Sequence, residues 1–490
     1  MKLYRLSIIL YLMLAASWTG AQTTMKPHEE RHAKRDRPNG ATMFPAELAE
    51  LRALSLVLGR PTDKSVVVSV LSADDREGYL EYGSSEGHPT ARIDLVKLPA
   101  NIPTDFLLDK LDRNTRYFYR LQHRKPGDSA FTAGPEYSFQ TQRSPGNTFT
   151  FEIQGDSHPE RPQQFDPALY AQTLRAVAAD RPDFYMTIGD DFSVDTLRTV
   201  TPEAVNNIYL NQRYFLGLAA HSSPIFLING NHEQAAACNL DGTPNNMAVW
   251  AQNTRNHIFP QPSPDGFYTG DTTEVPFIGL LRDYFAWTWG DALFVVIDPY
   301  WHSPNPVDAE HGGSKHPHRD LWAVTLGDEQ YQWFKKTLES SRARHKFVFT
   351  HHVLGTGRGG IEQADLFEWG GKNKKGDNEF AVRRAGWELP IHQLMAKNGV
   401  TIFFQGHDHL FARQQLDGVI YQTLAEPADP NYALYNKEAY RTGDILPNSG
   451  RVRVTVGPDQ VTVEYLHSWL PKDETESHKN GEVAFRYSIP

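Results

Sequence analysis

Short apolar runs that end in turns recur through the second part of the chain. Each run is four or five residues long, which is typical of a buried strand. A turn rich in Gly, Asp, Asn or His follows every run within a few residues. The runs span 149–153, 184–188, 225–228, 347–350 and 400–404, and their turns are Gly155-Asp156-Ser157-His158, Gly189-Asp190-Asp191, Asn229-Gly230-Asn231-His232-Glu233, His351-His352 and Gly406-His407-Asp408-His409.

Helical patterns alternate with these runs, which predicts an α/β domain over residues 144–490. In an open α/β sheet the carboxyl ends of the strands gather along one edge. The polar side chains of the five turns are therefore expected to meet at that edge. Expected helices span 167–179, 202–218, 328–342 and 388–397; further strands are expected at 292–297, 451–456 and 460–465, the last two completing a second sheet.

Residues 43–143 show a different pattern, in which short alternating runs are separated by turn residues. This spacing, without a helical period, predicts a β-sandwich of immunoglobulin or fibronectin type III kind. No set of candidate ligands lies in it, and residues 142–147 are expected to link it to the α/β domain. The alternating runs span 65–70, 79–82, 91–95, 116–121 and 136–140.

The amino terminus has the pattern of a signal peptide over residues 1–21. Lys2 and Arg5 precede an apolar run over residues 6–16, which is too short to span a bilayer, and small residues precede Ala21. A membrane anchor or a buried first helix is the alternative. The charged segment 22–42 is expected to be a flexible leader, so we expect a secreted or periplasmic protein without stable membrane insertion.

Composition narrows the function classes. The 490 residues suffice for two or three domains. A formal charge of −10 argues against non-specific binding to a nucleic acid duplex. A single cysteine, Cys238, excludes a disulfide within the chain. No partner base for Cys238 is apparent, so a nucleophilic role is not expected.

Two long segments, 303–320 and 355–386, start just past expected strands. Structureless segments of this length in a compact domain are usually functional or disordered. We expect them to form walls of a pocket. His302, His311, His316 and His318 either form a further metal patch or belong to an exposed His-rich loop, and their irregular spacing favours the loop.

The five turns, taken in order, resemble the motifs of the calcineurin-like metallophosphoesterase family. The resemblance covers most of residues 148–470, and residues 43–143 resemble the amino-terminal domain of purple acid phosphatases, a branch of that family. It implies a four-layer α-β-β-α domain preceded by a fibronectin type III-like β-sandwich.

The resemblance also implies a pair of metal ions that share Asp190. One ion is expected to be held by Asp156, His158, Asp190 and His409, and the other by Asp190, Asn231, His351 and His407. A carboxylate can bridge two cations through its two oxygens, and two ions can clamp a phosphoryl group. Imidazole and carboxylate do not select among Zn, Mn and Fe, so two divalent or trivalent transition-metal ions of unresolved identity are expected.

Further roles follow from the same resemblance. Attack of a metal-bound hydroxide on phosphorus is expected, with His232 as the catalytic residue that stabilises charge or protonates the leaving oxygen. Glu233 is expected to orient a histidine. The purple enzymes have an iron-binding Tyr where this chain has Ser193, while His158 supplies another ligand, so we expect a colourless enzyme.

Other polar residues near the turns leave alternatives open. His352 is expected to line the pocket, and Arg358 either grips substrate phosphate or is a solvated loop residue. Asp191 and Asp298 are expected to cap turns. Asp408 is expected to point away from the ions or to hold a histidine.

Together these features predict an exported phosphatase that hydrolyses phosphate monoesters of a small phosphorylated substrate. A phosphodiesterase acting on nucleotides or lipid headgroups is an alternative. A surface binding protein with structural metals is an alternative of another class, although structural sites are usually saturated by protein ligands. The oligomeric state is left open by the sequence.

Overall fold

The computed structural model describes residues 46–307, 320–354 and 357–490. The predicted signal peptide at 1–21, the predicted leader at 22–42, and His311, His316 and His318 lie outside these residues. Within the three described ranges, no helix has both the length and the apolar character that a membrane span requires.

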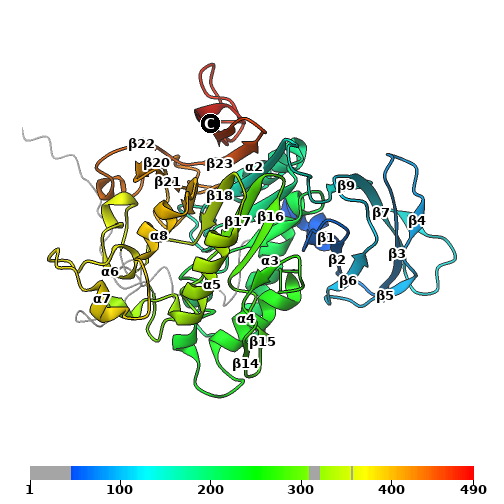
Figure 1. Ribbon diagram of the computed structural model, residues 1–490. Coiled ribbons are helices and arrows are strands. Elements are labelled where there is room, and N and C mark those ends of the chain that lie inside the picture. The colour runs from blue at the N-terminus through cyan, green and yellow to red at the C-terminus, as the bar shows by residue number, and fades with distance from the viewer. Residues whose placement is uncertain (1–45, 308–319, 355–356) are drawn as a thin grey trace, which may run out of the picture. The chain divides into compact units, whose positions relative to one another are not determined.

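Two antiparallel sheets follow a 3-10 helix, η1 (Ala46–Arg52), in the first part of the described chain (Figure 1). Alternate side chains are buried along β7 (Arg116–Arg124), whereas every side chain of β2 (Val66–Ser72) is buried. Side chains of both sheets, such as Val68 and Leu80, share one core. The two stacked sheets are the β-sandwich region predicted from the alternating runs. One sheet contains β1 (Leu54–Gly59), β2 (Val66–Ser72) and β6 (Thr104–Leu108), and the other contains β3 (Arg76–Gly83), β4 (Ala91–Arg92), β5 (Val96–Leu98), β7 (Arg116–Arg124), β8 (Thr132–Ala133) and β9 (Tyr137–Gln140).

Two larger sheets carry the five expected strands that precede the polar turns. The six-stranded sheet has the order β12-β11-β10-β23-β24-β25, and the eight-stranded sheet has the order β13-β16-β17-β18-β19-β21-β20-β22. The first comprises β10 (Phe149–Gln154), β11 (Phe184–Thr187), β12 (Ile225–Leu227), β23 (Gly450–Val456), β24 (Val461–His467) and β25 (Val483–Ile489). The second comprises β13 (Thr269–Gly270), β16 (Phe285–Trp289), β17 (Ala292–Val296), β18 (His345–Phe349), β19 (Ile402–Gln405), β20 (Phe411–Leu416), β21 (Val419–Thr423) and β22 (Asp444–Leu446).

An aromatic core lies between these two sheets. The ring centroid of Phe151 in β10 lies 5.2 Å from that of Phe294 in β17 and 5.6 Å from that of Phe347 in β18. All three side chains are fully buried. Burying aromatic rings at such distances stabilises a core by area and by ring geometry. This core holds together two sheets whose strand ends carry the polar turns.

Helices pack on the other faces of the two sheets. Tyr185 and Ile225 of the six-stranded sheet share a core with α2 (Pro167–Asp180), α3 (Pro202–Ala220) and α4 (Met247–Ile258). Val348 and Phe403 of the eight-stranded sheet share another with α5 (Gly327–Ser340), α6 (Phe367–Gly370) and α8 (Ile391–Lys397). The remaining short elements are η2 (Val194–Thr196), η3 (Ala237–Asn239), β14 (Glu274–Val275), β15 (Gly279–Leu280), η4 (Leu321–Ala323), η5 (Ile361–Gln363), α7 (Phe380–Arg383) and η6 (Lys437–Ala439).

The expected topology needs three corrections. The polar turns follow strands of two facing sheets: β10, β11 and β12 are parallel neighbours in one, and β18 and β19 are parallel neighbours in the other. The expectation of a single sheet edge is therefore wrong. The strands expected at 451–456 and 460–465 also do not form a separate second sheet, because β23 pairs with β10 and β24 pairs with β23. The segment 357–386 is also not a structureless wall, because η5, α6 and α7 lie in it and their side chains Trp369 and Phe380 are buried.

Candidate metal centre

Four of the candidate ligands have a left-handed backbone. The φ angles are 42° at His158, 59° at Asp190, 68° at His407 and 56° at His409. A residue other than Gly with positive φ is uncommon and costs on the order of 1 to 3 kcal/mol. A strained backbone conformation persists only where the surrounding structure enforces it. The conformation of these turns, and with it the direction of their side chains, is therefore fixed.

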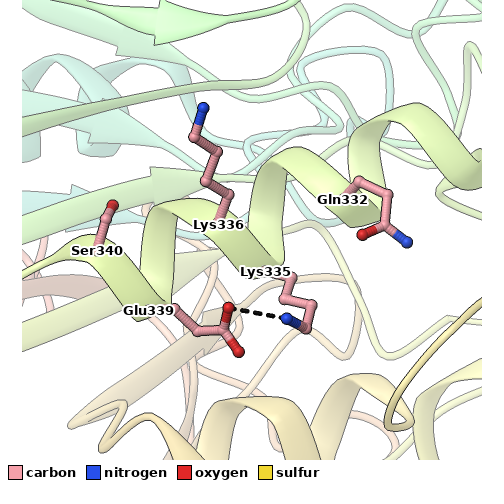
Figure 2. Close-up of a pocket in the computed structure, with 5 residues that line it drawn as sticks. All are labelled: Gln332, Lys335, Lys336, Glu339 and Ser340. Atoms are coloured by element: carbon pink, nitrogen blue, oxygen red, sulfur yellow. Dashed lines mark hydrogen bonds and ion pairs between the residues drawn. The ribbon is translucent and has the colours of Figure 1, made fainter.

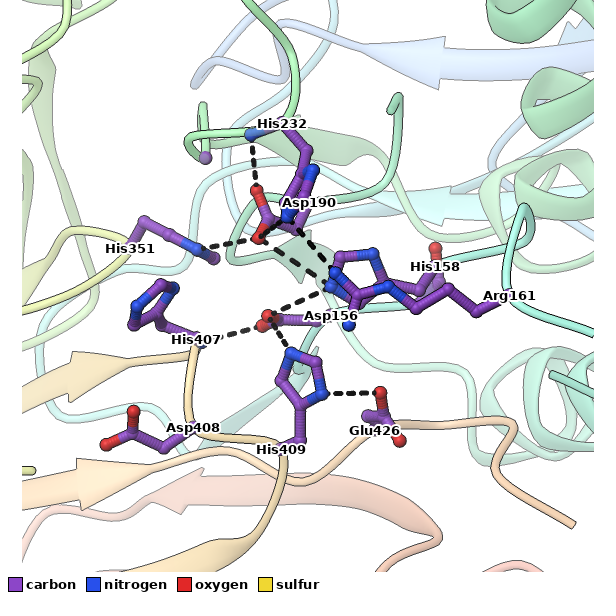
Figure 3. Close-up of polar contacts among 12 residues, drawn as sticks. Asp156, His158, Arg161, Asp190, His232, His351, His407, Asp408, His409 and Glu426 are labelled. Carbon is purple, nitrogen blue, oxygen red and sulfur yellow. Dashed lines mark hydrogen bonds and ion pairs between the residues drawn. The ribbon is translucent and has the colours of Figure 1, made fainter. Parts of the chain in front are cut away.

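The turns converge on two groups of ligand atoms. Asp156, His158 and His409 form one group, Asp190, His351 and His407 form the other, and the ligand atoms within each group lie within 4.8 Å of one another. Figure 3 shows Asp156 and Asp190 at the centre with the imidazoles around them. The structure therefore brings together six of the seven predicted ligands, although residues 156 and 409 lie far apart in the sequence.

Asp190 links the two groups through Oδ2. This oxygen lies 3.1 Å from His351 Nε2, 3.7 Å from His158 Nε2 and 3.9 Å from His232 Nε2. His158 and His232 also form a third group of close ligand atoms with Asp190. One carboxylate in reach of both histidine sets is the arrangement that a bridging ligand requires.

The seventh predicted ligand, Asn231, lies in the turn after β12. Its side chain is buried, and its backbone carbonyl oxygen accepts a hydrogen bond of 2.7 Å from Gln234 Nε2. Its role toward a metal stays a prediction.

The donor atoms of the two groups fit cations. Within the described residues, Asp156 Oδ2, His158 Nε2, His351 Nε2 and His407 Nδ1 are buried and have no hydrogen-bond partner. Buried polar atoms without a partner are costly, and a metal ion satisfies carboxylate oxygens and imidazole nitrogens together. The donor set therefore suits two transition-metal ions.

The other nitrogen of three histidines is held by an acceptor. His158 Nδ1 lies 3.0 Å from Glu160 Oε1, His409 Nδ1 lies 2.9 Å from Glu426 Oε1, and His351 Nδ1 lies 2.9 Å from the carbonyl oxygen of Ile188. An acceptor on one nitrogen turns the other nitrogen toward a metal. Figure 3 shows this for His409, which lies between Asp156 and Glu426.

Charge and burial act in opposite directions on the central carboxylates. Burial raises the pKa of Asp190, but the charges of His351 and His232 outweigh it and hold the pKa well below its usual value. The same holds for Asp156, whose pKa is lowered by His351, His158 and His409. Both carboxyl groups are therefore ionised at neutral pH, as ligands for cations must be.

His232 lies beside the two groups with its own partners. Its Nδ1 lies 2.9 Å from Asp195 Oδ1, and its Nε2 lies 3.1 Å from Arg161 Nη2. The backbone N–H of His232 donates to Asp190 Oδ1 at 2.9 Å. His232 is thus fixed between Asp190 and two residues, Asp195 and Arg161, that the sequence analysis missed.

Of four neighbouring carboxylates, two act as expected and two do not. Glu233 does not orient a histidine: it accepts hydrogen bonds from the backbone N–H groups of Gly230, Asp191 and Phe192 at 2.7, 2.9 and 3.2 Å. It therefore ties two ligand turns together.

Asp191 does not cap its turn, because its Oδ1 accepts from Ser157 Oγ at 2.6 Å and Gln154 Nε2 at 3.0 Å. Asp298 does cap a turn, accepting from the N–H of Tyr300 at 2.6 Å. Asp408 points away from the ligand groups (Figure 3) and accepts from Tyr440 Oη and the N–H of Gly359.

The two predicted substrate-binding residues lie on the His407 side. The ring centroids of His352 and His407 are 4.7 Å apart. Arg358 Nη1 lies 3.5 Å from Asp408 Oδ1, and its charge, after burial, contributes to lowering the pKa of His407. Arg358 Nε and Nη1 are buried and have no hydrogen-bond partner within the described residues.

Two glycines allow the turns to approach one another. A Cβ at Gly230 would lie 2.2 Å from Asp190 Oδ1, and a Cβ at Gly406 would lie 2.4 Å from Asp156 Oδ1. Neither position tolerates a side chain without moving a central carboxylate. The Gly in these two motifs is therefore explained by close approach.

A surface hollow elsewhere lacks comparable chemistry. It lies along α5, where Lys335 forms an ion pair of 2.8 Å with Glu339 (Figure 2). Its polar groups face solvent, and the ion pair is of the exposed i, i+4 kind that contributes little. The lining residues are Gln332, Lys335, Lys336, Glu339 and Ser340.

Comparison with known proteins gives three positive findings. The model of a family described as calcineurin-like phosphoesterase matches residues 150–411. The fold is similar to that of purple acid phosphatase PPD1 from yellow lupin (Lupinus luteus) seeds, with a TM-score of 0.58 and 18% identity over 89% of this chain and 74% of that one. It is also similar to the structure of PhoD, with a TM-score of 0.59 and 16% identity over 92% of this chain and 91% of that one. No curated protein matches the sequence.

Proposed function

The chain belongs to the calcineurin-like phosphoesterase family, and we propose that it is an exported phosphatase that hydrolyses phosphate monoesters with a pair of metal ions. Family membership implies a metal-dependent phosphoesterase. The observation that carries the proposal is the convergence of two ligand groups on Asp190 Oδ2.

We assign the candidate ligands to the two ions as follows. Asp156, His158, Asp190 and His409 hold one, and Asp190, Asn231, His351 and His407 hold the other. When bound, such a pair of ions binds phosphoryl oxygens, neutralises their charge and lowers the pKa of water. Whether the ions are Zn, Mn or Fe is not fixed by these ligands.

His232 is the residue we assign to the leaving group. Asp195 and Arg161 fix its ring, and Nε2 lies 3.9 Å from the shared oxygen of Asp190. Burial lowers the pKa of His232, but the carboxylates of Asp190 and Asp195 outweigh it and raise the pKa to about 9. The protonated ring can donate from Nε2 to an oxygen of a bound ester once that oxygen replaces the contact with Arg161.

Two guanidinium groups support a preference for a phosphate dianion. Arg161 contacts His232, which lies beside the Asp190–His158 group, and Arg358 lies near His407 of the other group. Arg358 Nε and Nη1 have no hydrogen-bond partner within the described residues, whereas Arg161 already contacts Gln164 and His232. A guanidinium with open N–H donors binds phosphate oxygens in pairs. A monoester offers more unsubstituted oxygens to such groups than a diester does.

We also infer the finer architecture that this function accompanies. The helices packed on the outer faces of two facing sheets support a four-layer α-β-β-α domain. The two sheets around one core support a fibronectin type III-like sandwich ahead of it. Export by the segment 1–21 is part of the proposal and rests on its sequence pattern.

The test is an ester assay on full-length purified protein. Metal is removed with a chelator and restored as Zn, Mn or Fe, and p-nitrophenyl phosphate is compared with bis-p-nitrophenyl phosphate. We expect metal-dependent turnover, with kcat/KM higher for the monoester. Loss of at least 100-fold in kcat is expected for His232→Ala, in line with the contribution of a general acid, and a loss is also expected for Asn231→Ala.

The matched control is His257→Ala, which removes an exposed histidine on α4 and is expected to keep full activity. Arg358→Lys is expected to raise KM with little change in kcat, because it keeps the charge but loses the paired donors. Preference for the diester would replace the monoester proposal by the diesterase. Metal binding without turnover of either ester would favour a surface binding protein.

A further inference from the structure

A second cluster of metal-type side chains lies apart from the Asp190 centre. Asp271, Asp283 and His302 place ligand atoms within 4.8 Å of one another. Asp271 follows β13, Asp283 precedes β16, and His302 follows β17. Strand β16 pairs with both β13 and β17, and Phe285 at its start is opposite Gly270 and Val296. The three residues therefore lie near the start of β16.

The two carboxylates are buried, and within the described residues three of their four oxygens have no donor, while Oδ1 of Asp271 accepts from the backbone N–H of Thr273 at 2.8 Å. Asp271 is 2% exposed and Asp283 is 1% exposed. Within the described residues, both oxygens of Asp283, Oδ2 of Asp271 and Nε2 of His302 have no hydrogen-bond partner. Burying ionised carboxylates in this way is costly unless a cation compensates them.

The cations already present leave these oxygens unsatisfied. Arg255 is within electrostatic reach of Asp283, but its guanidinium donates to the carbonyl oxygens of Leu227 and Arg282 at 2.7 and 3.2 Å. The neighbouring Asp298 differs, because it accepts hydrogen bonds from Asn229 Nδ2 at 2.8 Å and Tyr300 N–H at 2.6 Å. Asp283, unlike its neighbour Asp298, therefore has no hydrogen-bond donor on either carboxylate oxygen within the described residues.

The spacing suits ligands of one ion better than an ion pair. His302 Nε2 lies 3.4 Å from Asp283 Oδ2. A charge-assisted hydrogen bond would place the two atoms about 2.7 to 2.9 Å apart. Two ligands at tetrahedral Zn distances lie about 3.3 Å apart.

We propose that Asp271, Asp283 and His302 bind a divalent transition-metal cation at a third site, separate from the two ions around Asp190. Two carboxylates neutralise the charge of a divalent ion, and one imidazole joined to carboxylates suits Zn, Mn or Fe. The site joins the segment between β13 and β16 to the segment after β17, so its ion stabilises the fold without touching the ester.

The experiment measures metal content of the full-length protein. Protein stripped with a chelator is reloaded with Zn²⁺ and desalted, and Zn per chain is measured by mass spectrometry. We expect three Zn per chain in the wild type and two in Asp283→Asn and in His302→Ala. Circular dichroism reports whether each variant folds. If Asp283→Asn, a substitution at a buried residue, prevents folding, His302→Ala remains as the test, because His302 is partly exposed.

The control variant is Asp241→Asn, in an exposed turn whose carboxylate already accepts from Thr243 and Asn246. It is expected to keep three Zn. His302→Ala is expected to keep its esterase activity within about twofold while the melting temperature no longer rises with the third equivalent of Zn²⁺. Two Zn in the wild type, or three in both variants, would overturn the third site, and neither result depends on whether the protein turns over an ester.

Discussion

At the scale of the residue, the centre is built from histidines whose two nitrogens have separate tasks. His409 is the clearest case, since Glu426 holds Nδ1 and Nε2 lies 3.1 Å from Asp156 Oδ2. Glu426 is buried and sits in the chain well after the five turns. Its effect on the metal is therefore indirect and runs through the orientation of one ring.

This arrangement predicts the effect of Glu426→Gln. Loss of the carboxylate is expected to lower metal affinity about 10- to 100-fold, the range found for such partners of metal-binding histidines. Competition with a chelator of known affinity measures it. Glu388→Gln, at an exposed ion pair with Lys397, is the control. Equal affinity in both variants would show that Glu426 does not position His409.

Sequence patterns pointed to the candidate ligands that the structure brings together better than to the residues that contact them. Asp156, Asp190 and His407 are predictable because each lies two or three residues after the end of an apolar run. Glu160 and Arg161 lie two and three residues beyond His158, so their proximity was a usable signal. Glu426 had no such signal, because its contact with His409 depends on the path of the chain after β21.

At the scale of the element, the strand ends matter because they bring backbones into contact. Gly230 lies against the carboxylate of Asp190, and no atom larger than hydrogen fits there. The strands β11 and β12 are neighbours in the sheet. Their two turns are therefore kept close both by the pairing of these strands and by the contact between Gly230 and Asp190. A side chain at Gly230 would act on the metal centre without removing any ligand.

Gly230→Ala is therefore expected to abolish binding of at least one metal ion and reduce kcat/KM at least 100-fold. Gly386→Ala is the control, because a Cβ at Gly386 meets no atom within 4 Å. Metal content and activity are measured on both proteins, with circular dichroism to verify folding. Full metal content in Gly230→Ala would refute the close-approach explanation.

Some elements escaped the sequence analysis for physical reasons. Helix α4 contains Asn, Thr and His at several positions, which weakens its helical pattern. Its one clear signal was Asn246, whose side chain caps the helix by accepting from the N–H of Val249 at 3.0 Å. In the segment 357–386 the glycines suggested a loop, yet the buried rings of Trp369 and Phe380 anchor short helices there.

At the scale of the whole molecule, the fold depends on which strands share a sheet. Apolar runs predict strands, but they do not say that β23 and β24 join β10 while β18 and β19 join the other sheet. Such pairings connect residues about 300 positions apart, as in Phe151 and Val454. Local patterns carry little information about contacts of that separation, so the assignment of strands to the two sheets came from the structure.

A contact between the sandwich and the larger domain predicts a pH effect on stability. The His221 ring stacks on Tyr137 of β9 with centroids 4.0 Å apart, and burial lowers the His221 pKa from 6.5 to about 4. Because the folded pKa is lower, the unfolded chain binds more protons between these values. Stability is therefore lost as pH falls from 6.5 toward 4.

The loss of unfolding free energy attributable to His221 is on the order of 2 kcal/mol. Each unit of pKa difference corresponds to about 1.4 kcal/mol, and the partial exposure of His221 reduces the total. Denaturant unfolding of metal-free protein at pH 7 and pH 4.5 measures the difference. His221→Gln is expected to lose less stability over this range than the wild type, while His257→Gln is expected to match it. The same loss in all three proteins would refute the assignment.

The central claim is that two metal ions share Asp190. Anomalous X-ray diffraction from metal-loaded crystals, recorded at the absorption edge of the bound metal, tests it most directly. We predict two peaks about 3.5 to 4 Å apart, both in contact with the Asp190 carboxylate and each with its own pair of histidines. A single peak, or no peak at Asp190 in catalytically active protein, would contradict the account.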